Sequence, residues 1–276
     1  MGINAELVNM VASMRHAGVM KGTSVIELGA QDVCVIDDVV DRILSRFALP
    51  PIVKPISNAS ELYDLLGFPS YRAIDASGEH GALVFDLNED LRRCYNFADT
   101  FDLVTNLGTA EHCFDQRTVF SNIHNLCKTG GLMIHALPAQ GNVNHAFYNY
   151  HPRFFADLAT ANSYEVIDLS FTVDYKPEIT NYNRKNFQKW DSHDILFYAC
   201  FRKTDDSEFR VPFDGMFSAN NQLEGYMASS VDPLKTEFSP YLKGGNWENT
   251  KGTSIDKAGR TQTTTGFLKR LLGGWK

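Results

Sequence analysis

The sequence lacks an excess of positive charge and any long apolar run. Of its 276 residues, 26 are Lys or Arg and 33 are Asp or Glu, which gives a formal net charge of −7. This balance argues against a general nucleic-acid-binding role, because phosphate recognition needs a basic surface. No run reaches transmembrane length, and the N-terminus lacks a basic stretch followed by an apolar one. We therefore expect a cytoplasmic protein with no membrane span and no nucleic-acid partner.

Cysteine and histidine show no pairing or ligand pattern. The five cysteines are scattered and never form a C-x-x-C pair, which fits free thiols in a reducing compartment better than disulfides or a zinc site. The eight histidines show no H-E-x-x-H or other short ligand spacing. From spacing alone, we predict no metal site.

The feature around which the chain is organised is T-S-V-I-E-L-G-A-Q-D-V at residues 23–33. An apolar, β-branched run ends there in a carboxylate and a glycine, and a segment of helical periodicity follows at 34–47. The pattern predicts a strand, a tight turn and a helix. Open α/β sheets bind ligands at such turns, where a glycine lets the backbone approach the ligand closely.

Further strands alternate with helices along the chain. Apolar periodicity predicts seven strands, at residues 24–28, 71–75, 81–88, 101–106, 132–138, 164–173 and 194–201. It predicts helices at 5–20, 34–47, 58–66 and 117–127, and one starting at Pro152. Such alternation implies a mainly parallel sheet with right-handed crossovers.

The pattern weakens after about residue 204. We expect a domain over 1–205, with its core at about 20–203, and an irregular C-terminal extension over 206–276 that is partly packed and partly disordered. Residues 251–276 carry six Lys or Arg against one Asp, and 267–272 form a short amphipathic segment. A solvated terminal helix is a better interpretation of this segment than a partner or membrane contact.

Five segments, in order, resemble the motifs of class I S-adenosylmethionine-dependent methyltransferases. They are V-I-E-L-G-A-Q, Y-R-A-I-D, V-F-D-L-N, F-D-L-V-T-N and K-T-G-G-L-M-I. The resemblance implies an α/β fold, a three-layer α/β/α Rossmann-like arrangement whose sheet is mainly parallel with an antiparallel last strand. It also implies S-adenosyl-L-methionine as cofactor and S-adenosyl-L-homocysteine as product.

By this resemblance, the first motif borders the methionine end of the cofactor. Glu27 would help to place the ammonium group, directly or through water, with Gly29 and Gln31 in the same turn. Asn106, at the end of the fourth predicted strand, would lie beneath the sulfonium and the transferred methyl group.

The next two motifs match carboxylates that bind the nucleoside. Asp75 matches the acid that accepts hydrogen bonds from the ribose hydroxyls, since a cis-diol offers two donors to two acceptor oxygens. Asp86 matches the residue facing the adenine amino group, with Leu87 beside the ring. Acids at strand ends also cap turns in many α/β proteins, but several at one edge repel one another unless they share a ligand.

The first motif departs from the family pattern in its later glycines. Gln31 and Val33 stand where the second and third glycines would be. A pyrophosphate needs those glycines, so the departure disfavours NAD, FAD and a dehydrogenase. It also leaves room for a member of the family that binds without catalysing.

Two histidines and a glutamate are candidates for the acceptor's base. His112 follows the fourth predicted strand in a T-A-E-H turn and titrates near neutrality. Glu111 could orient it or act as base itself, or both residues could simply begin the next helix. His145 lies in the aromatic-rich stretch 144–151, which could stack on an acceptor or only cover the edge of the sheet. His135, inside a strand, is expected to be buried and structural.

The function that these features predict is methyl transfer to an O or N atom. The acceptor is unidentified, with a small molecule or sugar-like compound expected. The alternative is a non-catalytic Rossmann-like cofactor-binding or scaffolding protein. The sequence leaves the oligomeric state open.

Overall fold

A seven-stranded sheet forms the centre of the computed structural model, which describes residues 2–176, 178–183, 187, 190, 192–227, 253–255 and 261–263. Its strand order is β2-β1-β3-β4-β7-β5-β6. In chain order the strands are β1 (Ser24–Leu28), β2 (Ser70–Ile74), β3 (Phe101–Leu107), β4 (Cys127–Gln140), β5 (Glu165–Val173), β6 (Thr180–Asn181) and β7 (Ile195–Arg202). Two further strands, β8 (Thr253–Ile255) and β9 (Thr261–Thr263), pair only with each other.

Strand direction confirms the expected mixed sheet. The strands β2, β1, β3 and β4 are mutually parallel. β7, which is the last strand of this sheet in chain order, runs antiparallel to both of its neighbours, β4 and β5. The described helices are α1 (Ala5–His16), α2 (Asp37–Arg46), α3 (Ala59–Leu65), α4 (Leu91–Tyr95), α5 (Gln116–Leu126), α6 (Pro152–Ala161) and α8 (Glu224–Met227).

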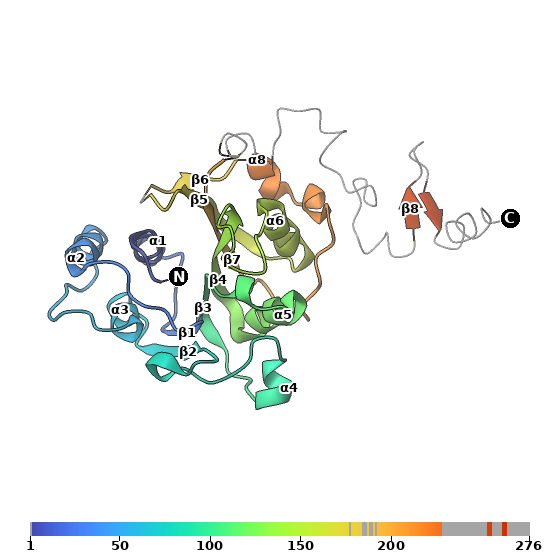
Figure 1. The fold of residues 1–276 in the computed structure, drawn as a ribbon. Coiled ribbons are helices and arrows are strands. Elements are labelled where there is room, and N and C mark those ends of the chain that lie inside the picture. The colour runs from blue at the N-terminus through green and yellow to red at the C-terminus, as the bar shows by residue number, and fades with distance from the viewer. Residues whose placement is uncertain are drawn as a thin grey trace.

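Helices cover both faces of the sheet, with α1, α2 and α3 on one side and α4, α5 and α6 on the other (Figure 1). The alternation of side chains along each strand divides the apolar core accordingly. In β1, Val25 packs with the first group of helices, whereas Ile26 and Leu28 pack with the second. The structure therefore confirms a three-layer α/β/α Rossmann-like architecture.

The strand expected at residues 81–88 is wrong. Leu83 makes only an isolated bridge to Ile74, and the Phe85 N–H then donates to the Leu83 carbonyl at 2.9 Å, which turns the chain away from the sheet. Phe85 stacks on Tyr95 with ring centroids 4.3 Å apart. This segment therefore packs on α4 and does not hydrogen-bond along the sheet. Its alternating apolar residues serve an aromatic cluster and not a strand.

Other elements also differ from the expected ones. The first helix ends at His16 and not at residue 20, and β4 spans Cys127–Gln140 and not 132–138. The helix predicted from residue 34 begins at Asp37, because the N-terminal segment pairs with the preceding residues. The Ile3 N–H donates to the Asp32 carbonyl at 2.8 Å, and the Cys34 N–H donates to the Ile3 carbonyl at 2.9 Å. The seventh strand of the sheet is β6, in the polar stretch where no strand was expected.

The described start of the C-terminal extension, residues 206–227, packs on the domain. The Asp157 carboxylate in α6 accepts hydrogen bonds from the Gly215 and Phe217 N–H groups at 3.0 and 2.8 Å, and Phe217 and Leu223 are buried. The amphipathic segment 267–272 and most of the basic stretch 251–276 lie outside the described residues. The boundary at residue 205 stays a prediction. Within the described part, no helix is long and apolar enough to cross a membrane.

Asp102 fastens the amino ends of β1 and β3, which yields a first prediction. Its carboxylate accepts hydrogen bonds from the Ser24 hydroxyl at 2.7 Å, from the Thr23 and Ser24 N–H groups at 3.0 Å each, and from Lys128 Nζ at 3.0 Å. Partial burial opposes ionisation, but these hydrogen bonds outweigh it and lower the pKa of Asp102 to about 2. At pH 7, Asp102→Asn should therefore lower the free energy of unfolding by about 1–2 kcal/mol.

The difference in the free energy of unfolding between the native protein and Asp102→Asn should shrink as pH falls from about 4 towards 2, because the native carboxylate becomes protonated there. Denaturant titrations over this pH range measure it. Asp99→Asn is the control. Asp99 and Arg72 form a solvent-exposed ion pair at 2.9 Å, so this substitution should lower the free energy of unfolding by less than about 1 kcal/mol. Equal deficits for both variants at pH 7 would contradict the assignment.

Candidate functional site

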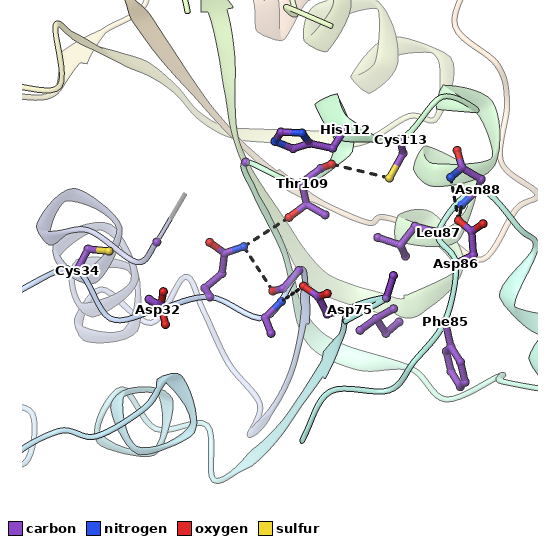
Figure 2. A pocket seen from close by; sticks show the side chains of 17 residues that line it. Asp32, Cys34, Asp75, Phe85, Asp86, Leu87, Asn88, Thr109, His112 and Cys113 are labelled. Carbon is purple, nitrogen blue, oxygen red and sulfur yellow. Dashed lines mark hydrogen bonds between the residues drawn. The ribbon is translucent and has the colours of Figure 1, made fainter. Parts of the chain in front are cut away.

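A cleft of about 650 Å³ opens at the carboxyl ends of β1, β2 and β3. Its walls come from the segments that follow these strands, at residues 29–34, 74–76, 85–88 and 108–113, together with Gly2 of the N-terminal segment. Figure 2 shows these side chains around one hollow, with His112 and Cys113 above it and Asp75 below. Ligands of open α/β sheets bind at this edge.

The turn after β1 brings the backbone close to the loop after β3. Gly29 has φ +78°, and a Cβ there would collide with the hydroxyl of Thr109 and with the amide of Gln31. The Thr109 hydroxyl donates to the Leu28 carbonyl at 2.6 Å, which joins the two loops. Only glycine fits this position, and its missing side chain leaves a backbone-lined floor in the cleft.

Gln31 folds into the same turn, where the family pattern has a glycine. Its side-chain nitrogen lies 3.4 Å from the Gly29 carbonyl and 3.5 Å from the Thr109 hydroxyl. Its side-chain oxygen is buried and has no hydrogen-bond donor among the described residues. A buried acceptor without a donor is rare in folded proteins. On the wall of a cleft, this acceptor suits a ligand that brings a donor.

Glu27 lies beneath this turn and does not line the cleft. Its carboxylate accepts hydrogen bonds from the Tyr63 hydroxyl at 3.1 Å, the Tyr71 hydroxyl at 2.8 Å and the Gln31 N–H at 3.3 Å. The side chain is fully buried, and this burial raises its pKa to about 7 although the tyrosine hydrogen bonds oppose the rise. Glu27 thus shapes the turn from below.

Asp75 follows β2 and lines the cleft. One carboxylate oxygen accepts hydrogen bonds from the Ser77 N–H and hydroxyl at 2.8 and 2.7 Å, and the other accepts one from the Ala30 N–H at 2.9 Å. Burial alone would raise the pKa of Asp75, but the hydrogen bonds outweigh it and the pKa is lowered. The second oxygen keeps acceptor capacity, because a carboxylate oxygen has two lone pairs.

Asp86 and Leu87 line the side of the cleft next to Asp75. One oxygen of Asp86 accepts two hydrogen bonds from Asn88, at 2.8 Å each. The other oxygen has no hydrogen-bond partner among the described residues. Leu87 is buried beside it and offers an apolar surface.

The electrostatic character of the cleft is acidic. Asp32, Asp75 and Asp86 line it, and its described walls contain no lysine and no arginine. Such a site attracts cations and repels phosphates, because its low-dielectric walls focus the field of the three carboxylates. Asp32 belongs to the predicted turn, but no sequence pattern indicated Gly2 or Cys34, which enter the cleft through the pairing of the N-terminal segment.

Asn106 lies outside the cleft lining. Its side-chain oxygen accepts the Ala110 N–H at 3.0 Å, and its nitrogen lies 3.2 Å from Nδ1 of His135. It therefore fixes the short 3₁₀ turn η2 (Ala110–His112) from below. His135 is buried, as expected, and this burial lowers its pKa to about 3.

The three candidate catalytic residues come together beside the cleft. His145 Nε2 lies 3.6 Å from a carboxylate oxygen of Glu111, and the rings of His145 and His112 meet edge to face with centroids 4.9 Å apart. His112 also lines the cleft, so it links the cluster to the cleft. Glu111 and His112 form η2 and do not begin α5, which starts at Gln116.

Tethers between two loops create this convergence. The Phe147 N–H donates to the Glu111 carbonyl at 3.1 Å, and the Tyr148 hydroxyl donates to the Phe114 carbonyl at 3.1 Å. The Tyr150 hydroxyl donates to Gln116, at 2.5 Å. The loop after β4 is thereby held against the turn after β3, although the two histidines are 33 positions apart in sequence.

Burial alters the proton affinities within the cluster. It raises the pKa of Glu111 to about 7. Burial and the nearby His145 lower the pKa of His112, so His112 is a neutral imidazole at pH 7 and can accept a proton.

An exposed aromatic pair flanks the cluster. Phe114 and Phe147 are 74% and 68% exposed, and their rings meet edge to face with centroids 6.3 Å apart. Tyr150, by contrast, is buried and packs on Phe120, so part of the aromatic stretch covers the sheet edge. Tyr150 therefore fits the interpretation that this stretch covers the sheet edge, whereas stacking of the exposed aromatic residues on an acceptor stays a prediction.

Comparison with known proteins finds no matching family model and no matching curated sequence. Several solved structures are similar. A 1,6-didemethyltoxoflavin-N1-methyltransferase from Burkholderia thailandensis, with S-adenosylhomocysteine bound, is 18% identical, covers 72% of this chain and 78% of its own, and has a TM-score of 0.39. TehB from Haemophilus influenzae is 10% identical, covers 69% of this chain and 60% of its own, and has a TM-score of 0.41.

A TehB-like SAM-dependent methyltransferase from Corynebacterium glutamicum is 18% identical, covers 73% of this chain and 88% of its own, and has a TM-score of 0.33. The strand order and strand directions of this chain establish its fold.

The environment of Glu27 yields a prediction for the pH dependence of stability. Its pKa rises from an ordinary 4.5 to about 7 in the folded protein. As pH increases, Glu27 therefore loses its proton in the unfolded state before it does so in the folded state. The free energy of unfolding should therefore fall between about pH 4.5 and 7, by roughly 1–3 kcal/mol from this group. Glu27→Gln, which stays neutral, should remove that decline.

Denaturant titrations of both proteins at pH 5 and pH 8 measure the difference. Glu79→Gln, the same substitution at an exposed position, should follow the native pH dependence. A Glu27→Gln variant that loses as much stability over this interval as the native protein would contradict the assignment.

Proposed function

We propose that this protein is an S-adenosylmethionine-dependent methyltransferase. The observation that carries the proposal is the acidic cleft at the carboxyl ends of β1, β2 and β3, with Asp75 and Asp86 on one wall and no lysine or arginine. S-adenosylmethionine has a sulfonium and an ammonium group but no phosphate. Its charge therefore matches this cleft, whereas that of a dinucleotide opposes it.

The residues of the cleft fit the parts of this cofactor. The free acceptor capacity of Asp75 suits ribose hydroxyls, and the open oxygen of Asp86 with Leu87 beside it suits an adenine amino group and ring. The orphaned oxygen of Gln31 suits the ammonium group, above the floor that Gly29 leaves open. Glu27 and Asn106 act indirectly in this proposal, through the turns that they hold.

When bound, the cofactor supplies an electrophilic methyl group on its sulfonium sulfur, and the leaving group is the neutral thioether. The protein has to align an acceptor and, for a hydroxyl or amine, remove its proton. His112 stands on the cleft wall and is backed by Glu111 and His145, so this cluster is the proton acceptor of the proposal. The exposed pair Phe114 and Phe147 favours a small, planar or sugar-like acceptor, because aromatic faces stack on such molecules.

The first test of the proposal is cofactor binding. Calorimetry with S-adenosylhomocysteine should show one site, and Asp75→Asn and Asp86→Asn should each weaken it by roughly 10–100-fold, the value of a charged hydrogen bond. Asp64→Asn, on the exposed side of α3, is the control and should bind as the native protein does. NAD⁺ should not bind. Absence of heat and of a thermal shift with the native protein would refute the proposal.

The second test is catalysis, measured as transfer of labelled methyl from S-adenosylmethionine to fractionated small molecules. On an acceptor found in this way, His112→Ala and His145→Ala should each lower kcat by about 10²–10⁴, since both contribute to proton removal. Cofactor affinity should stay near the native value in His145→Ala, because His145 does not line the cleft. Full turnover by both variants would contradict the assigned base, and binding without turnover on any acceptor would favour a non-catalytic binding protein.

A further inference from the structure

Glu111 is a buried acid in an unusual state. Its side chain has no exposed surface, and neither carboxylate oxygen has a hydrogen-bond partner among the described residues. A buried carboxylate without hydrogen bonds is costly, because burial removes its hydration and nothing replaces it. The His145 imidazole lies 3.6 Å from one of these oxygens, and the His112 ring packs edge to face on that of His145.

These three side chains form a compact set of potential ligands. One ligand atom from each of Glu111, His112 and His145 lies within 4.8 Å of the other two. Within the described part of the chain, neither imidazole donates or accepts a hydrogen bond that would hold it away from the others. Two imidazoles and a carboxylate are ligands that a divalent transition metal binds together.

We propose that Glu111, His112 and His145 form a binding site for a divalent transition-metal ion of the Mn²⁺, Co²⁺ or Zn²⁺ class. The site lies beside the cleft, and its third ligand, His112, is shared with the cleft wall. Metal binding as such does not depend on what the cleft holds. The metal's role in methyl transfer, described below, rests on the proposed function.

The distances are close to those of a loaded site. Ligand atoms of a tetrahedral metal at about 2.0–2.2 Å lie roughly 3.4 Å from one another. Glu111 and His145 are already 3.6 Å apart. The ligand atom of His112 lies within 4.8 Å of those of the other two residues, so the exposed His112 is the ligand that would move closer when a metal binds.

The type of donor set indicates what the metal would do. Three protein ligands leave at least one coordination position open, as in catalytic and unlike structural zinc sites. An acceptor hydroxyl bound at that position would become more acidic, since a coordinated oxygen loses its proton at lower pH. Under the proposed function, a bound metal would take the place of the imidazole as the activating group. The acceptor hydroxyl would release its proton to water in the adjoining cleft, and His112, which lines the cleft, would hold the metal next to it.

Short-range sequence patterns miss this site. Glu111 and His112 are adjacent, but His145 comes from the loop after β4, which the hydrogen bond between the Phe147 N–H and the Glu111 carbonyl fastens to the turn. Known ligand motifs place two histidines within a few residues of each other. The structure supplies the third ligand through a loop tether.

The test is metal binding by the full chain without cofactor. Protein freed of metal with a chelator is titrated with Mn²⁺ by calorimetry and with Co²⁺ by visible absorption. Mn²⁺ is included because thiolates such as Cys34 bind it weakly. We expect one ion per chain, with the visible bands of Co²⁺ at low coordination number.

Variants assign the site. His145→Ala and His112→Ala should each weaken Mn²⁺ and Co²⁺ binding by more than about tenfold, because each removes a direct ligand. Both histidines are exposed, so these substitutions should leave folding intact. Glu111→Gln tests the buried ligand in the same way and should also weaken metal binding. His151→Ala is the matched control, an exposed histidine at the end of the same loop, and should bind as the native protein does.

Three outcomes would overturn the proposal: no binding, binding that survives loss of either His112 or His145, or an equal loss in His151→Ala. In that case the cluster is a proton relay only. S-adenosylhomocysteine binding is measured separately. A protein that binds no metal would therefore contradict the metal site without contradicting the proposed methyltransferase function.

Discussion

A buried carboxylate holds together the elements from which the cleft is built. Glu27 in β1 accepts hydrogen bonds from Tyr71 in β2, from Tyr63 in α3 and from the backbone of Gln31 in the turn. No apolar side chain could satisfy these three donors, and losing the acceptor would leave them buried without partners. The position of the turn after β1, and with it the floor of the cleft, therefore depends on an acid that touches no solvent.

The acidic residues at this edge of the sheet have two different roles. Glu27 lies inside and organises the turn, while Asp75 and Asp86 lie outside and keep acceptor capacity for a ligand. Their environments differ accordingly. Burial raises the pKa of Glu27 to about 7, whereas hydrogen bonds outweigh burial and lower the pKa of Asp75. A cleft with an ionised Asp75 on its wall is suited to a cationic ligand with hydroxyl and amino donors.

Much of the sheet could be predicted from the sequence, because its strands are apolar runs with clear ends. β1, β2 and β3 fall within a residue of their expected positions. The segment around Phe85 could not, since its apolar residues serve an aromatic cluster with α4, and strand periodicity does not distinguish the two uses. The late start of α2 arises from pairing with Ile3, a contact far away in sequence.

The position of residues at strand ends could be predicted from the sequence, but contacts between loops could not. Gly29, Gln31, Asp75, Asp86 and Leu87 line the cleft, whereas Glu27 and Asn106 do not. The two point inwards because a strand alternates its side chains, and a count of residues to the strand end does not fix the face. The meeting of His145 with Glu111 depends on backbone hydrogen bonds between loops, which no local pattern encodes.

The most direct test of the account is a structure of the protein crystallised with S-adenosylhomocysteine. The account predicts the nucleoside in the cleft, with the ribose hydroxyls on the Asp75 carboxylate, the adenine beside Asp86 and Leu87, and the sulfur on the side of His112. A ligand bound elsewhere, or a ribose that makes no contact with Asp75, would contradict it.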